Sequence, residues 1–330
     1  MKTRATLKDV ARAAGVSSAS VSLAMAGKVA VSSELQTRIA AAAARLDYEP
    51  NLAARTLASR RSGLLAIVVS PLDDGVVVRT AAAALCALER RGYGVLLVSE
   101  TTAEHLDMPG LARRGVEAVL FVGRAPGRAE REALSARRLA WVAVADADDG
   151  DPRCLEFGRP RAVELACRYL QQTGRRSVGL LGRPGLALTE WVRQLVQTGT
   201  AIDLTAPALP GSALRRLLET SGQPAAIVCA DDLAALAVLR ECALRGISIP
   251  QDLAVVGFGD EPFARCARPA LTTVRPVCAE VGAHAAEALL DVLAGRSCAP
   301  YAPRHKLVLR ETTNGPENVP RGTTGGPGST

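Results

Sequence analysis

The stretch from residue 6 to residue 25, TLKDVARAAGVSSASVSLAM, most constrains this chain, because it fits two short helices joined by a tight turn. Thr6, with Asp9 three residues later, fits a capping box at the start of the first helix. Gly15 supplies the turn, and Ser17 fits the N-cap of the second helix. Apolar residues at helical spacing and a hydrophobic staple complete the pattern: Leu7, Val10, Ala11 and Ala14, then Val16 and Val21. The stretch predicts either a helix-turn-helix or a helical hairpin inside an ordinary core.

The next segment favours the helix-turn-helix because it adds a third small helix to the same core. Either Ser32 or Ser33 can cap this helix. Its inward-facing residues recur at helical spacing: Leu35, Ile39, Ala43 and Leu46. Pro50 disfavours a helical conformation for the residue before it, so the helix should end near residue 48 or 49. A short Ala-rich segment that ends in two arginines follows.

Five motifs occur in order across residues 5–62: KDVA, AGVS, VSSELQTRI, a D-Y-x-P-N turn and an A-R-x-L segment. In this order and spacing they resemble the DNA-binding headpiece and hinge of the lactose/galactose-repressor (LacI/GalR) family of bacterial transcription regulators. The similarity continues more loosely to about residue 313. The resemblance implies a homodimer on a palindromic double-stranded DNA operator, with the second helices reading two half-sites and paired hinge helices opening the minor groove between them.

The charge distribution supports a DNA-binding N-terminus independently. Residues 1–62 hold ten Lys/Arg and four Asp/Glu, a net charge of +6 out of +7 for the whole chain. A basic balance confined to the N-terminal fifth is what a phosphate-contacting module needs. The remaining 268 residues are almost neutral.

The cysteines and the apolar runs exclude other classes of protein. Eight cysteines are scattered from Cys86 to Cys298 without a C-x-x-C pair, so the sequence predicts buried thiols and no metal or cofactor. The polar, basic start of the chain does not resemble a signal peptide, and no apolar run approaches the length of a membrane span. We therefore expect a cytoplasmic protein with no membrane contact.

From residue 62 onward, apolar runs alternate with amphipathic helices. The predicted strands are 64–70, 94–99, 118–123, 141–146, 177–182, 226–231 and 253–260, and the predicted helices are Arg79–Arg91, Arg161–Gln171 and Leu233–Arg245. Such alternation predicts parallel, doubly wound sheets, and two successive series predict two lobes. Ligands bind beyond the carboxyl ends of the strands in such sheets, so we expect the binding site between the lobes.

Together with the resemblance, these patterns predict four parts. They are an all-α helix-turn-helix headpiece (1–48), a hinge helix and linker (49–62), an α/β periplasmic-binding-protein-like core of two doubly wound lobes (63–313) and a disordered tail (314–330). The resemblance places the crossings between lobes near Phe157, Val274 and Ala302. The N-lobe then covers about 63–157 and 274–301, and the C-lobe about 158–273 and 302–313.

The predicted DNA contacts lie at the start of the headpiece and on the second helix: Thr6, Ser17, Ser18, Ala19, Ser20, Ser22 and Leu23. Serine hydroxyls can bond phosphates or base edges, whereas Ala19 and Leu23 offer only apolar contact, for instance to a thymine methyl group. Ser17 can equally be no more than a cap, and Leu23 can pack against the headpiece instead. Many family members carry Arg at the position of Leu23, so the operator sequence does not follow from the resemblance.

The resemblance adds hinge contacts from Asn51, Arg55 and Leu57. Leu57 lies between Arg55 and Arg60, and an apolar side chain flanked by arginines can wedge between base pairs in the minor groove. The alternative is an ordinary core leucine, but a short Ala-rich segment offers little to pack against. Such a helix is too short to be stable in isolation, so we expect it to order on DNA.

The resemblance also implies the residues that line or border the effector cleft: Asp73, Asp74, Asp146, Phe157, Arg193, Asp231, Phe258 and Asp260. Carboxylates there would accept bonds from sugar hydroxyl groups, an arginine would donate a fork of bonds, and an aromatic ring would stack on a sugar. Loop solvation or a strand-end cap is the alternative role for each. Three features depart from the family pattern: the loop 73–77, Asp231 where Asn is common, and Gly259 where a ligand-binding Asp is common.

Two classes of function fit such a chain: a ligand-responsive transcription regulator and an enzyme on the doubly wound core. An enzyme is disfavoured, because the chain lacks a P-loop, an H-E-x-x-H and a G-x-S-x-G motif, and its three histidines are widely spaced. The sequence therefore predicts a non-enzymatic, sequence-specific transcriptional repressor whose operator affinity is modulated by a sugar or sugar derivative bound between the lobes. The alternative is a DNA-binding regulator with a degenerate pocket, controlled by another class of ligand or by a protein partner.

Overall fold

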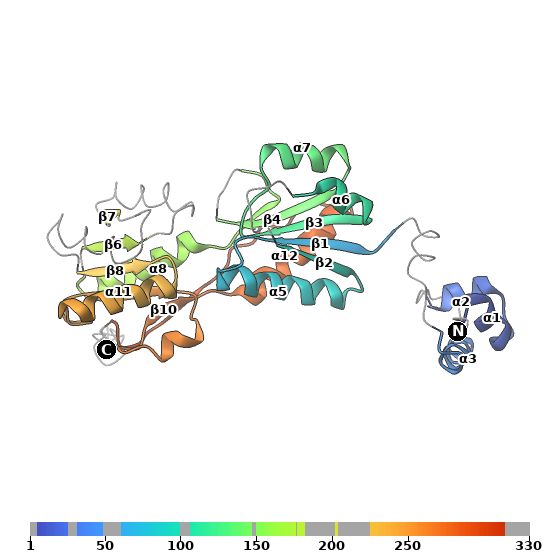
Figure 1. Ribbon diagram of the computed structural model, residues 1–330, viewed down its shortest axis with the longest axis horizontal. Helices are drawn as coiled ribbons and strands as arrows, with labels where there is room; N and C mark the ends of the chain where they lie inside the picture. The colour runs from blue at the N-terminus through green and yellow to red at the C-terminus, as the bar shows by residue number, and fades with distance from the viewer. Residues whose placement is uncertain are drawn as a thin grey trace, which may run out of the picture. The chain divides into compact units, whose positions relative to one another are not determined.

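The structure of the protein is a computed structural model that describes residues 5–25, 32–48, 61–99, 106–146, 150–175, 177–181, 202–203 and 225–313 (Figure 1). The chain divides into two compact units, Met1–Gly63 and Leu64–Thr330. Some predictions fall outside the described residues: the hinge helix with Asn51, Arg55 and Leu57, the effector residue Arg193, and the tail 314–330. No helix in the described part of the chain is long and apolar enough to cross a membrane.

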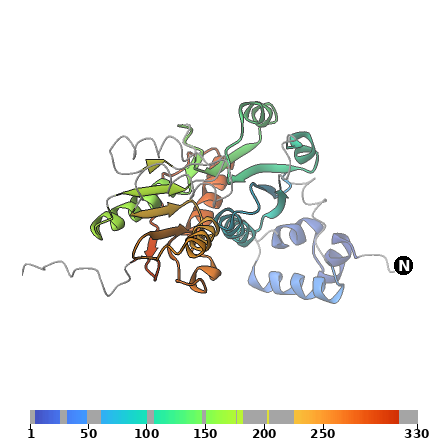
Figure 2. The ribbon, with the colours of Figure 1, turned by 60° about the vertical axis from the view of Figure 1, so that its left-hand side comes forward.

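The first unit packs three helices around one small apolar core: α1 (Leu7–Ala14), α2 (Ser18–Met25) and α3 (Ser33–Arg45) (Figure 2). Val10, Val21 and Ile39, one from each helix, are at most 1% exposed. Gly15 ends α1 at a φ of +64°, a left-handed conformation that glycine adopts without strain. The predicted three-helix headpiece is confirmed.

The capping residues behave largely as predicted. The Asp9 carboxylate accepts from the Thr6 N–H at 2.9 Å, and Ser17 Oγ accepts from the Ser20 N–H at 3.1 Å. Ser32 caps α3. The predicted end of α3 near residue 48 or 49 is wrong, because Asp47 turns into the left-handed region at a φ of +49° and the helix already stops at Arg45.

The N-lobe of the second unit is built on a five-stranded parallel sheet in the order β2-β1-β3-β4-β5. Successive side chains face opposite sides, so Ile67 packs with residues of α5 and α12, whereas Val68 packs with residues of α6 and α7. The ribbon shows these helices on the two faces of the sheet (Figure 1). The strands are β1 (Leu64–Val69), β2 (Gly94–Ser99), β3 (Val116–Val122), β4 (Ala140–Ala145) and β5 (Cys154–Glu156); the helices are α5 (Gly75–Arg90), α6 (Met108–Arg113), α7 (Arg128–Ala136) and α12 (Cys278–Leu293).

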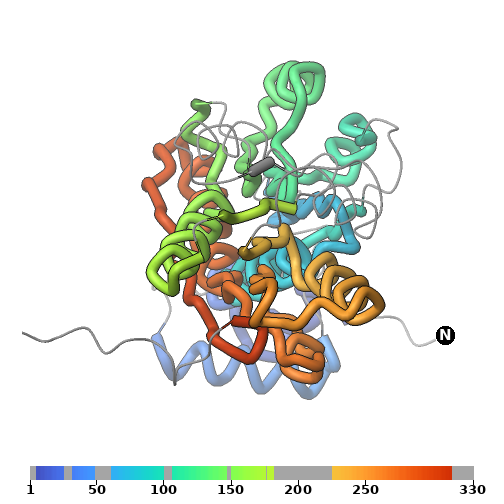
Figure 3. Tube along the Cα trace, turned by 90° about the vertical axis from the view of Figure 1, so that its left-hand side faces the viewer, coloured from blue at the N-terminus to red at the C-terminus, as the bar shows by residue number. Residues whose placement is uncertain are grey.

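The C-lobe sheet has the order β11-β10-β9-β8-β6-β7, and among its described strand pairs only β10–β11 is antiparallel. Val228 packs toward α8 and Ile227 toward α11, so these helices lie on opposite faces of the sheet (Figure 3). The strands are β6 (Val178–Leu181), β7 (Ile202–Asp203), β8 (Ala226–Cys229), β9 (Ala254–Phe258), β10 (Thr272–Arg275) and β11 (Lys306–Val308); the helices are α8 (Arg159–Gln172), α11 (Asp232–Arg245) and the 3₁₀ turn η1 (Pro262–Arg265).

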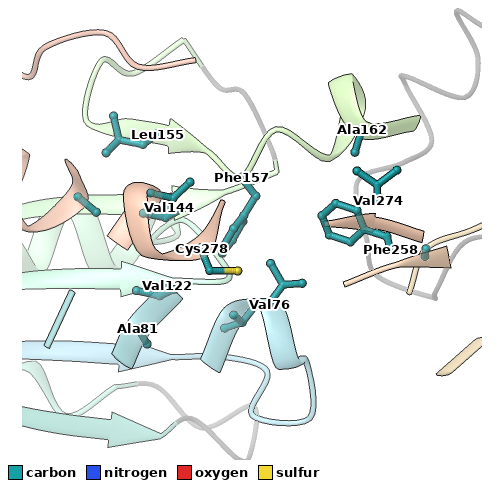
Figure 4. Packing of buried hydrophobic residues seen from close by; sticks show 14 of the residues in the cluster. Val76, Ala81, Val122, Val144, Leu155, Phe157, Ala162, Phe258, Val274 and Cys278 are labelled. Atoms are coloured by element: carbon teal, nitrogen blue, oxygen red, sulfur yellow. The ribbon is translucent and has the colours of Figure 1, made fainter. Parts of the chain in front are cut away.

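Three segments connect the lobes: residues 157–158 between β5 and α8, residues 276–277 between β10 and α12, and residues 294–305 between α12 and β11. The first and third lie side by side, because a Cβ on Gly158 would come within 2.5 Å of Pro303 Cγ. Gly158 also has a φ of +78°, which favours glycine. One apolar cluster runs through this junction and includes Phe157 from the N-lobe side and Phe258 from β9 (Figure 4).

The predicted fold class, a helical headpiece followed by two parallel α/β lobes, is confirmed, and most predicted strands and helices of the core differ from the observed ones by one or two residues at each end. One helix start is wrong. Helix α5 begins at Gly75 rather than Arg79, because the Asp74 carboxylate accepts from the N–H groups of Val76 and Val77 and caps the helix there.

Candidate functional site

Helix α2 presents a surface with few hydrogen-bond donors. Ala19, Ser22 and Leu23 are exposed along one side of the helix, and Leu23 is 41% exposed. The alternative in which Leu23 packs into the headpiece core is therefore not what the structure shows. This side can offer one hydroxyl group and two apolar groups to DNA.

The other predicted contacts at this end are engaged within the headpiece. Ser17 caps α2, and its hydroxyl also lies 2.9 Å from that of Ser20. Ser18 and Ser20 are half-buried. Thr6 is exposed, and its hydroxyl donates to Asp9 at 2.6 Å. Ser17 and Thr6 therefore have a structural role in addition to any contact with DNA.

At the junction of the lobes, an arginine that the sequence interpretation did not single out joins two predicted effector residues. Arg159, the first residue of α8, is only 5% exposed. Its guanidinium donates to Asp74 Oδ2 at 2.5 Å and also to Asp146 Oδ2. Asp74 precedes α5 and Asp146 follows β4, so both carboxylates belong to the N-lobe, whereas Arg159 starts a C-lobe helix. We call these three residues the clasp.

Two aromatic rings enclose the clasp. The Arg159 guanidinium carbon lies 5.3 Å from the Phe157 ring centre and 5.4 Å from that of Phe258, distances typical of cation–π contacts. His305 packs edge-on against Phe258 at 5.9 Å, and its Nε2 donates to the Gly158 carbonyl at 3.1 Å. The structure thus brings Asp74, Asp146, Phe157 and Phe258 together, as the resemblance implied, but around the chain's own guanidinium.

Burial governs the electrostatics here. It raises the pKa of Asp146 above the ordinary value, although the charge of Arg159 acts in the opposite direction. Burial also lowers the pKa of His305. Among the described residues, three polar atoms of the junction are buried without a hydrogen-bond partner: Asp146 Oδ1, Arg159 Nε and His305 Nδ1. In the described part of the chain, the clasp itself therefore holds one buried acceptor and one buried donor without a partner.

Asp260 is also held by arginines of the chain. Arg275 Nε and Arg310 Nη2 each donate to it at 2.5 Å, and its side chain is 3% exposed. Burial alone would raise its pKa, but the bonds from Arg310 and Arg275 outweigh burial and hold the pKa below the ordinary value. Its carboxylate therefore already has two charged donors.

The remaining predicted effector residues are dispersed. Asp231 caps α11 by accepting from the Ala234 N–H at 2.7 Å, so it has the alternative role of a strand-end cap. Asp73 is exposed in the turn before α5.

A cavity of about 540 Å³ lies elsewhere, between the loop before β5 and the end of α12. Arg153 and Arg131 on its wall pair with Asp151 at 2.7 and 3.7 Å, and Arg296 pairs with Asp291 at 2.5 Å.

No group of three His, Cys, Asp or Glu side chains within the described ranges could hold a metal ion.

Comparison with known proteins identifies the family. Residues 6–51 match the family described as bacterial regulatory proteins, lacI family, and residues 110–313 match the periplasmic binding protein-like domain. The chain is 32% identical to the HTH-type transcriptional regulator GntR of Pseudomonas aeruginosa, over 94% of this chain and 96% of that protein. This chain belongs to the LacI family. It is a non-enzymatic, DNA-binding transcriptional regulator.

Other LacI-family proteins are also similar to this chain over nearly its whole length. The HTH-type transcriptional regulator MalR of Streptomyces coelicolor is 30% identical, over 96% of both chains. A lac repressor dimer bound to operator and the anti-inducer ONPF has the same fold, with a TM-score of 0.74 and 23% identity over 94% of this chain and 99% of that one. A CelR–cellobiose complex matches with a TM-score of 0.65 and 24% identity, over 94% of this chain and 100% of that one.

Sequence reasoning missed Arg159 and also Arg79, which bonds across the lobes to Glu261. One signal for Arg159 was present. A cation in the first turn of a helix is opposed by the helix dipole, so an arginine at that position of a LacI-family core suggests carboxylates nearby. No comparable signal marks Arg79.

Proposed function

We propose that this LacI-family regulator is a repressor whose affinity for a palindromic operator changes when a small ligand binds between its lobes. The first ligand class to test is a sugar or sugar derivative. Relatives supply this choice, since one is named the ribose operon repressor of Bacillus subtilis and one solved structure is a CelR–cellobiose complex. The observation that carries the proposal is the two-lobed core, whose lobes meet at a junction that carries the aromatic rings of Phe157 and Phe258.

In this proposal the headpiece (1–48) reads the operator through the exposed side of α2. Asn51, Arg55 and Leu57 of the hinge (49–62) contact the minor groove, with Leu57 as the wedge. Coupling between ligand and operator of about 1 to 3 kcal/mol would change affinity roughly 5- to 150-fold.

A homodimer is the proposed binding form, because a two-fold operator requires two headpieces. Part of its contact is proposed on the N-lobe edge. Among the described strands, β2 pairs with β1 alone, Leu97 on β2 is 56% exposed, and Val78 on α5 is 39% exposed. An unpaired edge strand with exposed apolar side chains is a surface that a second copy can cover. Sedimentation of the wild-type chain and of Leu97→Glu tests this contact. A variant that dimerises as strongly as wild type would show that the dimer interface does not include Leu97.

A second candidate is regulation by another class of ligand or by a protein partner. The observation that favours it is the occupancy of the predicted sugar-binding carboxylates, since Asp74 and Asp146 are bonded by Arg159 and Asp260 is bonded by Arg275 and Arg310. Gly259 also lacks the carboxylate that is common at its position in the family. A thermal-shift panel of sugars, sugar acids and nucleobases separates the two candidates. A shift with any sugar supports the first, and none beside intact DNA binding supports the second.

The decisive experiment for DNA recognition is selection of genomic fragments by the purified chain at moderate salt, followed by footprinting. A shared palindrome with protection across its centre is the expected result, because the half-sites and the hinge contacts would both be protected. Binding that falls steeply with salt and shows no shared site would instead indicate phosphate contact alone and would overturn the proposed operator specificity.

A further inference from the structure

The clasp joins the lobes directly and is nearly closed to solvent. Arg159 is 5% exposed and Asp74 is 8% exposed. The two carboxylates belong to the N-lobe and the guanidinium to the C-lobe, so separating the lobes here would break both ion pairs. Removing Arg159 alone would leave two buried carboxylates without a compensating charge, which is strongly unfavourable.

The clasp and the cap of α5 supply donors to three of the four oxygens of its carboxylates. Asp74 Oδ1 accepts from the N–H groups of Val76 at 2.9 Å and Val77 at 3.3 Å, while its Oδ2 accepts from Arg159. Asp146 Oδ2 accepts from Arg159 as well. Of the four carboxylate oxygens, Asp146 Oδ1 alone lacks a partner among the described residues. Three of the four oxygens therefore already accept from the chain and the fourth is buried, so a ligand hydroxyl group meets no free, exposed acceptor here.

The surroundings match a guanidinium group. Two carboxylates face its terminal nitrogens, and the rings of Phe157 and Phe258 lie within cation–π distance of its carbon. The same features would hold a cationic ligand, but Arg159 already fills the position. The arginine thus stands in the interlobe site as a ligand would.

We propose that Arg159 is a built-in occupant of the interlobe site: it withdraws Asp74 and Asp146 from effector binding and sets the closure of the lobes in the ligand-free protein. The statement about the effector rests on the proposed function, whereas the statement about closure rests on the clasp alone. Ligand selectivity then comes from groups other than these two carboxylates.

The test replaces the guanidinium chemically. Ethylguanidinium has the atoms that Arg159→Ala lacks, so it can refill the vacated position. Thermal unfolding of the full chain is measured for wild type, Arg159→Ala and Arg161→Ala, each with and without millimolar ethylguanidinium chloride. Arg161 is exposed on the same helix, so its variant controls for the loss of an arginine and for general effects of guanidinium.

We expect Arg159→Ala to unfold at a lower temperature and ethylguanidinium to raise its midpoint by about 2 °C or more, because binding to the folded state stabilises it. The midpoints of wild type and Arg161→Ala should not rise. An Arg159→Ala chain that folds but shows no rise would overturn the proposal.

A second variant covers the case in which Arg159→Ala does not fold. Asp74→Asn/Asp146→Asn/Arg159→Met keeps the side-chain volumes without buried charge, and Asn remains a good helix cap. We expect amide hydrogen exchange across residues 157–165 to become about tenfold faster than in wild type, since the junction opens more readily. Unchanged exchange there would overturn the statement about closure. Neither measurement uses DNA or an effector, so a wild-type chain that selects no operator would overturn the proposed function and leave the clasp result unaffected.

Discussion

The guanidinium of Arg79, on helix α5 of the N-lobe, donates a hydrogen bond of 2.9 Å to the backbone carbonyl of Gly259 in the C-lobe. The same guanidinium pairs with Glu261. The lobes are therefore linked in both directions, by Arg79 from the N-lobe and by Arg159 from the C-lobe. Gly259 has a φ of +137°, a conformation that side chains rarely adopt, so the carboxylate common at this position in the family cannot be restored here without strain.

Replacing Arg79 tests the second link. Arg79→Gln should lower the free energy of unfolding of the core by about 1 kcal/mol, because the Arg79 side chain is 39% exposed and partly exposed ion pairs contribute modestly. Urea unfolding measures the change, and Arg90→Gln at the exposed far end of the same helix is the control. Equal losses in both variants would show that the contacts across the lobes add nothing measurable.

A buried carboxylate close to Gly259, that of Asp232, makes the free energy of unfolding depend on pH. Asp232 is fully buried, and burial raises its pKa to about 6 from 3.8, with the charges of Glu261 and Asp260 adding to the shift. It accepts from Thr273 Oγ1 at 2.5 Å and from the Glu261 N–H at 2.7 Å. Gly257 leaves room for it, since a Cβ there would lie 2.2 Å from Asp232 Oδ1.

The direction of the pH effect follows from the raised pKa. The folded chain holds this proton more tightly than the unfolded chain does, so the contribution favours folding below pH 4 and is lost as the pH rises through about 6. In Asp232→Asn, an amide can donate to the Thr273 hydroxyl and accept from the Glu261 N–H. We expect wild type to lose up to about 3 kcal/mol relative to this variant between pH 4 and 7. Urea unfolding across that range measures the difference, and a constant difference would refute it; Asp231→Asn, which keeps its helix cap, is the control.

The contact between α5 and α12 gives a prediction about packing. A Cβ on Gly282 of α12 would lie 2.4 Å from the Thr80 carbonyl oxygen and 2.8 Å from the Ala84 nitrogen, both backbone atoms of α5. Gly282→Ala must therefore push the two helices apart, at a cost of about 1 to 3 kcal/mol in unfolding free energy. Gly127→Ala is the matched control, because its Cβ would meet only Glu130, at 3.7 Å. Similar losses in both variants would argue against a close approach of the helices.

The headpiece and the strands could be predicted because their signals are local. The Ser17 cap accepts from the N–H of Ser20, three residues later in the chain. Each buried strand is likewise a short apolar run between turns. The clasp could not be predicted in this way, since Arg159 bonds to a carboxylate 85 residues earlier in the chain. Helix α12 was also not predicted, although its polar residues Glu280, His284, Glu287 and Asp291 recur at helical spacing.

The candidate site shows the same limit in its chemistry. The resemblance identified Asp74, Asp146, Phe157 and Phe258, and the structure does bring them together. What residue types alone cannot show is whether a carboxylate is open to a ligand or already bonded. That depends on arginines that periodicity leaves unmarked, and these arginines decide how many groups remain for an effector.

The exposed side of α2 carries the last prediction. Leu23→Glu places a negative charge where the helix is expected to meet DNA, so operator affinity should fall by about 1 to 3 kcal/mol or more, and the fold should be unaffected because Leu23 is exposed. Gln36→Glu, exposed on α3, adds the same charge away from α2 and is the control. Fluorescence anisotropy on the selected operator measures binding, and circular dichroism checks the headpiece. If Leu23→Glu bound as tightly as Gln36→Glu, α2 would not be the reading helix, and the operator would have to be recognised by another part of the headpiece or by the hinge.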